Sequence, residues 1–514
     1  MLNNIGLFLT KRAFLNPERE AYVDGNLGLR LSFAQLNARC NRLASALLAA
    51  GIQKEDRVGL LLMNSAEFVE AFFALGKIGA VAVPLNWRLV PDELEFILKD
   101  SGCSRLIFSE EFVEPVTELH SRGDKTDIWQ WLQVVANTPC AEFADNYVEF
   151  RDSGADSEPE PGADEDAMMF IMYTSGTTGL PKGVVHTHKS VLWGCLTISA
   201  TIYYQEGERY LSALPMFHVG SLTPLITNIY QGATSIVMRN FDPLRSWELI
   251  ESEKITSGLM VPAMLNFMLQ VPDYQRFDHS ALRWCMAGAA PVPTALIRSY
   301  LDLGIEIHQV YGLTETCGPS CVITSENALN KIGSTGKAFF HTDIQVVDDG
   351  GQVCKPGESG EVWVRAEHNM REYWNRPDAT AETIVDGWLR TGDVAVMDEE
   401  GFVYIQDRIK DMIISGGEKV YPAEVENALQ GHPKVLEAAV IGMESAKWGE
   451  SPLAIIVKND DSLTEEEILE YCRGKLARFK QPVKAVFVDT IPRNPSGKIL
   501  KRVLRVEYDQ PAPV

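Results

Sequence analysis

The chain has 514 residues, of which 47 are basic and 70 acidic, so its formal net charge is −23. A chain of this length needs at least two domains, and a hydrophobic content of 46% excludes a disordered protein. The negative charge disfavours non-specific binding to nucleic acid or to an anionic membrane. Any polyphosphate ligand must therefore be held by positive groups gathered at one place.

Cysteine usage and the ends of the chain suggest a cellular compartment. The nine cysteines lack the paired spacing of a zinc site, so we interpret them as reduced thiols. The N-terminal residues lack the basic region and apolar run of a signal peptide, and nowhere do eighteen apolar residues follow one another. The C-terminal residues carry no prenylation or peroxisomal signal. We expect a cytoplasmic protein without an integral membrane segment.

Helix and strand patterns alternate in the first hundred residues. Ser32 is a suitable N-cap for a helix that ends before Gly51. The next segments are predicted in turn as strand, helix, strand and helix, at 57–63, 66–78, 79–85 and 91–101. Such alternation predicts parallel sheets packed between helices. We interpret the acidic, proline-containing run at 151–166 as a solvated connector with no catalytic role.

An apolar stretch at 167–173 has the length of a strand and leads into a loop rich in glycine and hydroxyl groups. The loop contains Thr174, Ser175, Gly176, Thr177, Thr178, Gly179, Lys182 and Gly183. Glycine lets backbone N–H groups approach a ligand, while the hydroxyls and the lysine can bind phosphate oxygens. The lysine spacing is not that of P-loop NTPases, so the pattern predicts a phosphate loop of another kind. A flexible surface turn is the alternative.

Four later segments also run from a strand into a turn that presents a functional residue type. The segment 211–221 presents His218, and the segment 282–291 presents Gly288, Ala289 and Ala290. The segment 307–316 presents Thr314 and Glu315, and the segment 387–395 presents Asp393. Each has a structural alternative: a histidine or aspartate in a turn is commonly structural, and small residues also allow a strand to pack closely on a helix. A Thr-Glu pair is also typical of a helix N-terminus.

The last part of the chain has a different pattern. Charged residues at 407–411 interrupt a strand predicted at 402–406, and two glycines, Gly416 and Gly417, follow. By itself this is a charged turn. Beyond it we predict a small α+β unit with helix 422–430, strands 435–442 and 452–457, helix 464–476 and strand 485–488. Near its end Lys498 follows Ser-Gly, where a lysine would ordinarily be solvated.

Several of these segments match one family. The string Tyr-Thr-Ser-Gly-Thr-Thr-Gly-Leu-Pro-Lys-Gly at 173–183 resembles the signature of the adenylate-forming (AMP-binding) superfamily. That group contains acyl-CoA and aryl-CoA synthetases, adenylation domains of peptide synthetases and beetle luciferases. Tyr-Gly-Leu-Thr-Glu at 311–315 and Trp-Leu-Arg-Thr-Gly-Asp at 388–393 extend the resemblance, which covers nearly the whole chain and favours the fatty-acid or aryl-acid CoA ligase branch. Glu372 departs from it, because relatives commonly have glycine there.

The resemblance implies an α/β fold in two domains. Residues 1–407 would form a large N-terminal domain of parallel-rich sheets with packed helices, which binds AMP and the acyl group. Residues 408–514 would form a small mobile α+β C-terminal domain, with the hinge near Lys410. Gly416 and Gly417 would leave room for the pantetheine arm of coenzyme A.

The resemblance also implies a site for ATP and Mg²⁺. Tyr311 would stack on adenine, Thr314 would contact the α-phosphate, and Glu315 would hold the metal, since a carboxylate beside polyphosphate needs a bridging cation. Asp393 would bind the ribose hydroxyls, and Arg408 the ribose or a phosphate. The implied nucleotide-binding residues are Thr174, Ser175, Gly176, Thr177, Thr178, Gly179, Lys182, Gly288, Ala289, Ala290, Tyr311, Gly312, Thr314, Asp393 and Arg408. The implied catalytic residues are Lys498, Glu315, Thr174 and His218.

An acyl pocket is implied beside the nucleotide site. The residues expected to line it are Thr197, His218, Val219, Gly220, Met260, Gly312, Cys317 and Gly318. Its three glycines leave the pocket unobstructed, and no acidic residue marks it for an amino group.

The implied reaction is the activation of a carboxylic acid. A carboxylate is a poor acyl donor because its leaving group would be oxide, whereas AMP leaves easily. We therefore expect an ATP-dependent acyl-CoA synthetase whose partners are ATP, coenzyme A and a medium- or long-chain fatty acid or an arylalkanoic acid. The alternatives are a feruloyl- or cinnamoyl-type aryl-acid CoA ligase, an adenylation enzyme that loads an acyl carrier protein, and a nucleotide-binding protein without catalysis. No nucleic-acid partner is expected, and a homodimer is left open.

Overall fold

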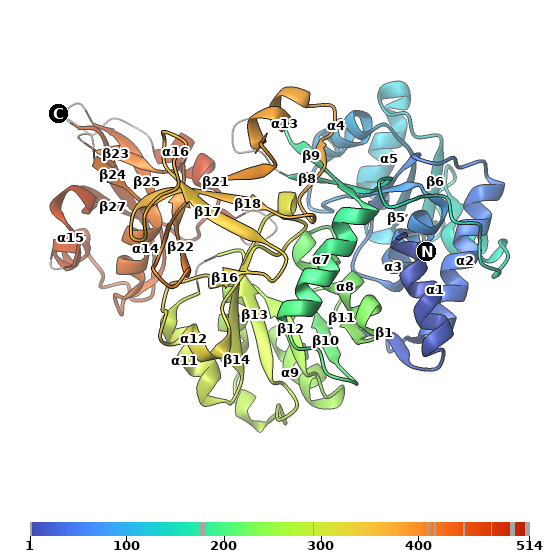
Figure 1. The fold of residues 1–514 in the computed structure, drawn as a ribbon, viewed down its shortest axis with the longest axis horizontal. Helices are drawn as coiled ribbons and strands as arrows, with labels where there is room; N and C mark the ends of the chain where they lie inside the picture. The colour runs from blue at the N-terminus through green and yellow to red at the C-terminus, as the bar shows by residue number, and fades with distance from the viewer. Residues whose placement is uncertain are drawn as a thin grey trace.

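The computed structural model describes residues 3–174, 180–290, 292–409, 411–415, 418–445, 448–473, 475–493 and 499–508, with Ser325 and Lys419 described by their backbone alone. In Figure 1 the N-terminus lies on the right and the C-terminal segments lie on the left. The strands of the described residues form four sheets. None of the helices in these ranges has the length and apolar character needed to cross a membrane.

The first sheet is mainly parallel. Its strands lie in the order β16 (Lys337–Ala338), β15 (Cys321–Val322), β14 (Glu306–Tyr311), β13 (Trp284–Gly288), β12 (Ser257–Met260), β10 (Arg209–Ser212), β11 (Thr234–Val237), β1 (Glu20–Asp24) and β2 (Arg30–Ser32). The pairs that join β1, β11, β10, β12, β13 and β14 are parallel. The loops that follow β12, β13 and β14 therefore leave from one edge of the sheet, where ligands bind in parallel α/β folds.

The second sheet has a parallel centre and an antiparallel edge. Its strands lie in the order β19 (Glu372–Tyr373), β9 (Lys182–Thr187), β8 (Met168–Thr174), β4 (Val81–Pro84), β3 (Arg57–Leu61), β5 (Cys103–Ser109), β6 (Gln130–Val134) and β7 (Asp145–Asn146). The strands β8 and β9 form an antiparallel hairpin. This hairpin carries the predicted phosphate loop.

Helices cover the outer faces of both sheets and fill the space between them. They are α1 (Gly6–Leu15), α2 (Phe33–Ala49), α3 (Ala66–Ile78), α4 (Pro91–Ser101), α5 (Val113–Ser121), α6 (Tyr147–Asp152), α7 (His188–Thr201), α8 (Val219–Gln231), α9 (Pro243–Ser252), α10 (Pro262–Leu269), α11 (Thr294–Asp302), α12 (Ser325–Ala328) and α13 (Pro377–Thr383). Side chains of α7 and α8 share one core cluster with α1, α2, α3 and strands of both sheets. The helices α9, α10 and α11 pack on the opposite face of the first sheet.

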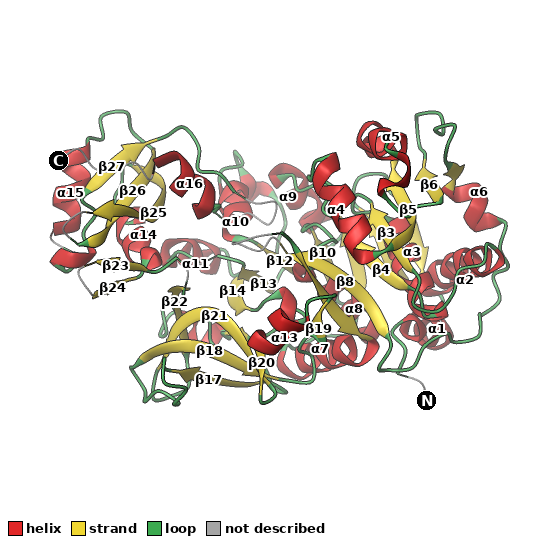
Figure 2. Ribbon diagram, turned by 90° about the horizontal axis from the view of Figure 1, so that it is seen from above, coloured by secondary structure: helices red, strands yellow, loops and turns green. Residues whose placement is uncertain are grey.

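The two remaining sheets belong to the later part of the chain. The third contains β17 (Asp343–Val347), β18 (Ser359–Arg365), β21 (Trp388–Met397) and β20 (Ile384–Val385), with β22 (Val403–Arg408) paired to β21. The fourth contains β24 (Glu418–Val420), β23 (Ile413–Ser415), β26 (Gly449–Lys458) and β25 (Val435–Ser445), with β27 (Lys484–Phe487) paired to β26. Figure 2 shows the fourth sheet grouped with α14 (Pro422–Gln430), α15 (Glu465–Arg473) and α16 (Lys501–Tyr508). The predicted fold class is confirmed.

Local sequence explains where several helices begin and end. Ser32 and Gln35 bond each other's backbone N–H groups, and this capping box starts α2 at Phe33 as predicted. The helix α3 stops where Gly79 adopts a left-handed φ of 76°. The helices predicted at 66–78, 91–101 and 422–430 are confirmed to the residue.

The acidic connector at 151–166 is not wholly solvated, contrary to our prediction. The fully buried Lys77 extends its amine to Glu158 in the connector, at 2.8 Å between Nζ and Oε2. The same amine donates to Asn37 and Asn41 at 2.6 Å each. Backbone packing is also close, because a Cβ on Gly162 would lie 1.8 Å from the carbonyl oxygen of Ile78. The connector therefore closes over the end of α3.

Replacing Lys77 tests how far this buried cluster stabilises the fold. Lys77→Met keeps the apolar length of the side chain but leaves Glu158 and both asparagines without their shared donor. We expect the free energy of unfolding to fall by about 3 kcal/mol in a chemical denaturation experiment, since removing one partner of a buried pair strands the others. The exposed Lys54 provides the control, and Lys54→Met should change stability little. Equal effects of the two variants would contradict this account.

Candidate active site

The predicted phosphate loop is fixed at both ends by a hairpin. The last residue of β8, Thr174, pairs with the first residue of β9, Lys182, and the Thr174 hydroxyl lies 3.5 Å from the Lys182 carbonyl oxygen. Ser175, Gly176, Thr177, Thr178 and Gly179 lie outside the described residues, so their role as phosphate ligands stays a prediction. The hairpin brings Lys182 back to the strand that enters the loop.

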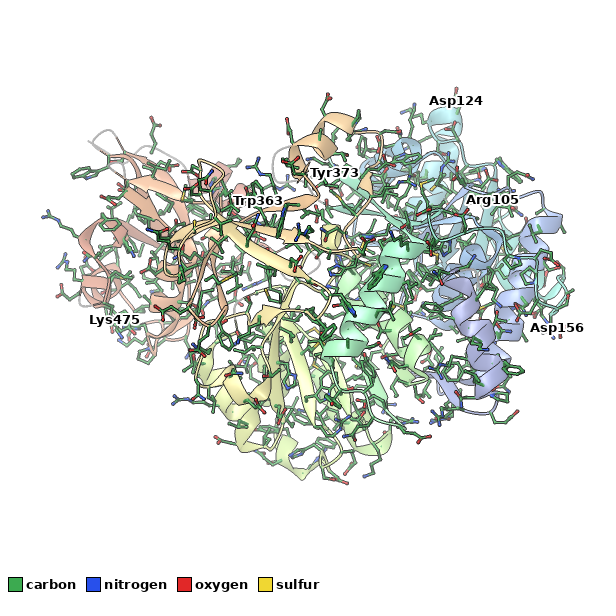
Figure 3. The ribbon with its side chains drawn as sticks, in the orientation of Figure 1. Arg105, Asp124, Asp156, Trp363, Tyr373 and Lys475 are labelled. Carbon is green, nitrogen blue, oxygen red and sulfur yellow. The ribbon has the colours of Figure 1, made fainter. Side chains whose placement is uncertain are left out.

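Lys182, Tyr373 and Glu315 form a row beside this loop. The amine of Lys182 lies 4.6 Å from the centre of the Tyr373 ring, and the Tyr373 hydroxyl donates to Glu315 Oε1 at 2.8 Å. Tyr373 reaches this place because β19 pairs with β9, as its label beside these strands in Figure 3 shows. Burial and the neighbouring Glu315 carboxylate raise the pKa of Tyr373, so its hydroxyl keeps the proton that it donates. A cation, an aromatic face and a carboxylate thus stand side by side.

The backbone that carries Glu315 is held at three consecutive carbonyl oxygens. It forms a single 3-10 turn, η4 (Thr314–Thr316). His186 Nε2 and His368 Nδ1 lie 2.7 and 2.8 Å from the carbonyl oxygens of residues 314 and 316, and the Met370 N–H donates to that of Glu315 at 2.7 Å. Burial lowers the pKa of both histidines to about 4, so each is neutral at pH 7 and donates its ring N–H to a carbonyl. These bonds fix the direction of the Glu315 side chain.

Tyr311, Asp393 and Arg408 form a second group. The Tyr311 hydroxyl donates to Asp393 Oδ2 at 2.7 Å, and Arg408 Nε lies 3.0 Å from Asp393 Oδ1. Asp393 stands opposite Arg408 because β21 and β22 are paired in that register. Each carboxylate oxygen has further acceptor capacity, so Asp393 can also accept hydrogen bonds from two vicinal hydroxyls. This is the property that a ribose-binding aspartate needs.

Arg408 connects the two groups electrostatically. Burial lowers its pKa, but Asp393, Tyr311 and Glu315 together raise it by more, so the pKa ends above its ordinary value. The guanidinium therefore stays charged beside both carboxylates. Together with Lys182 it provides the locally gathered positive charge that an acidic chain needs to hold a polyphosphate.

Two predicted nucleotide-site glycines are required by close backbone packing. A Cβ on Gly288 would lie 2.5 Å from the Val310 carbonyl oxygen, and one on Gly312 would lie 1.4 Å from the Gly318 carbonyl oxygen. Ala289 has a left-handed φ of 67°, and like Ala290 it is exposed at the end of β13. The glycines thus bring strand and turn together, and the alanines leave an open backbone edge.

Most of the predicted acyl-pocket residues lie on α7, on α8 and in the turn around η4. They are Thr197, His218, Val219, Gly220, Gly312, Cys317 and Gly318. Thr223 in α8 donates to the Cys317 carbonyl oxygen at 2.7 Å and ties this helix to the turn. Met260 lies apart from them, because its side chain packs with α9, α10 and α11 on the other face of the first sheet.

His218 lies at the start of α8, beside the predicted acyl-pocket residues Val219 and Gly220. It precedes α8 directly, and among the described residues its buried Nε2 has no hydrogen-bond partner. Burial, with a smaller effect of Arg88, lowers its pKa to about 4. The ring is therefore neutral and a weak base at pH 7, unlike the tuned histidine of a general base.

The predicted hinge, coenzyme A and lysine positions, Lys410, Gly416, Gly417 and Lys498, lie outside the described residues. Their neighbours are joined by ion pairs. Lys501 in α16 lies 2.9 Å from Glu426 and 3.8 Å from Asp407, and Arg505 lies 3.0 Å from Asp411. The helix that follows Lys498 is therefore bound to both sides of position 410.

The donor set fits a magnesium ion that arrives with ATP. The described residues contain no cluster of three or more His, Cys, Asp or Glu side chains that could hold a metal alone. Mg²⁺ with a nucleotide needs none, because it keeps several waters and takes one or two protein carboxylates together with phosphate oxygens. Glu315 offers such a carboxylate, with Oε1 anchored by Tyr373.

Sequence analysis missed Tyr373, His186 and His368. Alternate residues of a strand face the same side, so residues 182, 184 and 186 of β9 lie on one side of the sheet. This period of two residues could have indicated from the sequence that His186 lies on the same side as Lys182. Tyr373 and His368 lie 58 and 52 residues from their partners in η4 and had no local signal.

The buried histidines predict how stability depends on pH. Burial lowers the pKa of His186, His188, His218 and His368 from 6.5 to about 4. Between about pH 6.5 and pH 4 the unfolded chain therefore binds more protons than the folded protein, and the free energy of unfolding should fall as the pH is lowered through this window. Guanidinium titrations at several pH values would measure the slope.

A single variant assigns part of that slope to one residue. In His188→Gln one of the four groups is removed, so the slope should become shallower. An unchanged slope in the His188 variant would contradict the assignment.

Comparison with known proteins agrees with this geometry. The chain matches the AMP-binding enzyme family over residues 9–374 and the AMP-binding enzyme C-terminal domain over residues 424–498. It is 45% identical to the long-chain-fatty-acid–CoA ligase FadD13 of Mycobacterium tuberculosis, covering all of both chains, and 38% identical to a feruloyl-CoA synthase of an Amycolatopsis species, covering 98% and 99%. Its fold matches that of O-succinylbenzoate coenzyme A synthetase (MenE) from Bacillus subtilis in complex with ATP and magnesium, with a TM-score of 0.86, 34% identity and coverage of 97% and 99%. The chain therefore belongs to the AMP-binding enzyme family.

Proposed function

We propose that this protein is an AMP-forming acyl-CoA synthetase that joins a medium- or long-chain fatty acid, or an arylalkanoic acid, to coenzyme A. The observation that carries the proposal is the pair of linked groups in the site. Lys182, Tyr373 and Glu315 stand where phosphates and a metal would lie, and Arg408 connects them to Asp393, which suits a ribose. FadD13 and the feruloyl-CoA synthase support the choice of acid classes.

In the first step a carboxylate oxygen of the acid attacks the α-phosphorus of ATP. A new O–P bond forms as the bond to the pyrophosphate oxygen breaks, and the products are an acyl-adenylate and pyrophosphate. This chemistry needs positioning and charge neutralisation more than covalent help. Lys182 and Arg408 supply fixed positive charge, and we assign Lys498 to bridge the carboxylate and the α-phosphate. When bound, Mg²⁺ neutralises phosphate charge, and Glu315 is the residue that would hold it.

In the second step the thiol sulfur of coenzyme A attacks the acyl carbonyl carbon. The C–S bond forms, the C–O bond to AMP breaks, and the thiol proton passes to solvent. Lys498 has to leave before the thiol can enter, so we place a hinge near Lys410 between domains 1–407 and 408–514. The end of β22 at Arg408 and the start of the fourth sheet at Ile413 support this boundary.

The state of the cysteines fits a location in the cytoplasm. All nine cysteines are free thiols, as expected in a reducing compartment. We place the protein there, where ATP and coenzyme A are both available.

Replacing Lys498 tests the first step. Lys498→Ala should slow acid-dependent ATP–pyrophosphate exchange. We expect its activation free energy to rise by about 2–4 kcal/mol, the range for the loss of one preorganised donor. The panel of acids runs from acetate to palmitate and includes benzoate, cinnamate and ferulate. Lys475→Ala is the control, because Lys475 is an exposed lysine of the same small domain (Figure 3).

Three outcomes of that experiment differ in meaning. Thioester formed by one class of acids, and lost in the Lys498 variant, supports the proposal and names the class. Pyrophosphate exchange without formation of an acyl-CoA thioester would indicate that the acyl acceptor is an acyl carrier protein instead of coenzyme A. No exchange with any acid would contradict the catalytic assignment.

Replacing Tyr373 tests the placement of the metal carboxylate. Tyr373→Phe keeps the ring below Lys182 but removes the bond to Glu315, so ATP affinity measured by calorimetry with Mg²⁺ should fall about tenfold. Affinity for ATP in EDTA should stay nearly constant. Tyr147→Phe is the matched control, because Tyr147 donates to the buried Glu70 at 3.1 Å in another part of the fold. A loss that is equal with and without Mg²⁺ would contradict this role of Tyr373.

A further inference from the structure

A layer of side chains separates α7 from one face of the first sheet. It contains Ile198, Ile202, Tyr204, Tyr210, Leu259, Trp284, Met286, Val310, Val322 and Phe339. The cluster is apolar except for the polar groups of its aromatic rings. It lies on the side of the sheet that also faces the predicted acyl-pocket residues of α7 and α8.

Three hydroxyl groups in or beside this layer are buried without a partner. They belong to Tyr204, Tyr210 and Ser212, and none has a hydrogen-bond partner among the described residues. Tyr210 and Ser212 are alternate residues of β10, so both point to the same side of the sheet. The Tyr204 ring stands edge-on to Trp284, with ring centroids 6.5 Å apart. Tyr210 pairs with Ser257 of β12, which pairs in turn with Trp284 of β13, so Tyr210 and Trp284 lie at the same height in the sheet.

On the opposite face of the same sheet two ring polar groups are paired, although the buried Gln309 Nε2 on that face has no partner among the described residues. There the Tyr300 hydroxyl donates to the Leu265 carbonyl oxygen, and the Trp247 indole N–H donates to the Met268 carbonyl oxygen, at 2.8 Å each. Leaving a buried hydroxyl unpaired destabilises a fold by about 1–3 kcal/mol. Three in one layer, close to a proposed substrate site, point to a ligand that supplies the missing partners.

Strand geometry sets the depth of this layer below the reactive centre. Gly288 and Tyr311 end their strands at the nucleotide site. Trp284 lies at the other end of β13, four residues from Gly288. At 3.3 Å per residue, Trp284 and the neighbouring Tyr210 are therefore about 13 Å from the nucleotide end of the sheet. Met286 and Val310 lie between, and an unbranched methionine adapts to a chain that passes it. A chain attached to a carboxylate at the sheet edge would bring its far end to the tyrosines.

We propose that the preferred acid carries a hydroxyl group at the end remote from its carboxylate, and that Tyr204 and Tyr210 bind this hydroxyl. Ser212 lies at the level of Met286, two residues nearer the nucleotide site, beside the chain that passes it. The proposal rests on the acyl-CoA synthetase function above and specifies its substrate. The acyl chain lies between α7 and the first sheet, past Met286. A plain alkyl chain of the same length leaves the two tyrosine hydroxyls unpaired and is therefore the poorer substrate.

Matched pairs of acids test the proposal. Each ω-hydroxy acid from eight to fourteen carbons is compared with the plain acid of the same length, and 4-coumarate with cinnamate, by kcat/KM for acyl-CoA formation. At one length we expect the hydroxylated acid to be favoured by at least about tenfold. Tyr210→Phe and Tyr204→Phe should each reduce that preference several-fold, because only the hydroxylated acid loses a hydrogen bond.

Tyr22→Phe is the matched control. Tyr22 is also a buried tyrosine whose hydroxyl has no partner among the described residues, but it packs in the cluster formed with α2, α3 and α8. This variant should keep the preference for the hydroxylated acid. It also corrects for any loss of stability that follows from removing a buried hydroxyl.

The outcomes separate this proposal from the one on which it rests. Equal use of both acids in every pair, or a preference unchanged in the Tyr210 and Tyr204 variants, would overturn the hydroxyl assignment and leave the synthetase function standing. If no acid of any pair forms a thioester or drives pyrophosphate exchange, the synthetase function fails and this inference with it.

Discussion

The ion pair of Arg408 with Asp393 is the interaction on which the proposed nucleotide site depends. Asp393 and Glu315 both act on the charge of Arg408, and without this positive charge the two carboxylates would repel a polyphosphate. Arg408 pairs with Asp393 and its charge is also supported by Glu315. Tyr311 donates a neutral hydrogen bond to Asp393, and Tyr373 donates one to Glu315. The site therefore holds both carboxylates without concentrating negative charge.

Local signals could be read from the sequence, and long-range ones could not. The bounds of α3 follow from Ser65 as N-cap and Gly79 as C-cap, which are neighbours of the helix in the chain. Tyr311 and Asp393 were predicted as nucleotide-binding residues because each lies in a matched motif, and the structure joins them by a hydrogen bond. Tyr373 joins Glu315 only because β19 pairs with β9, which no local pattern reveals. Burial of Lys77 against the connector likewise depends on contacts between distant segments.

The first sheet combines two tasks because its faces are built differently. Against α9, α10 and α11 it forms a core whose ring polar groups are paired within the protein. Against α7 it leaves hydroxyls unpaired, and α7 begins directly after β9 of the phosphate hairpin. One continuous segment thus carries Lys182, which we propose binds phosphate, and then covers the layer proposed for the acyl chain. Under both proposals the same hairpin and helix would align the reacting groups of the two substrates.

The contacts around position 410 show how a hinge there could move at little energetic cost. Lys501 pairs with Glu426 at 2.9 Å and Arg505 with Asp411 at 3.0 Å, and all four residues follow the proposed pivot, so a rotation preserves both pairs. Asp407 precedes the pivot, and its contact with Lys501 is the longer one at 3.8 Å. Asp407 also accepts a hydrogen bond across the pivot from the Ala423 N–H, at 2.9 Å. Because the short ion pairs stay within the rotating part, α16 would carry the Lys498 segment with the fourth sheet as one body.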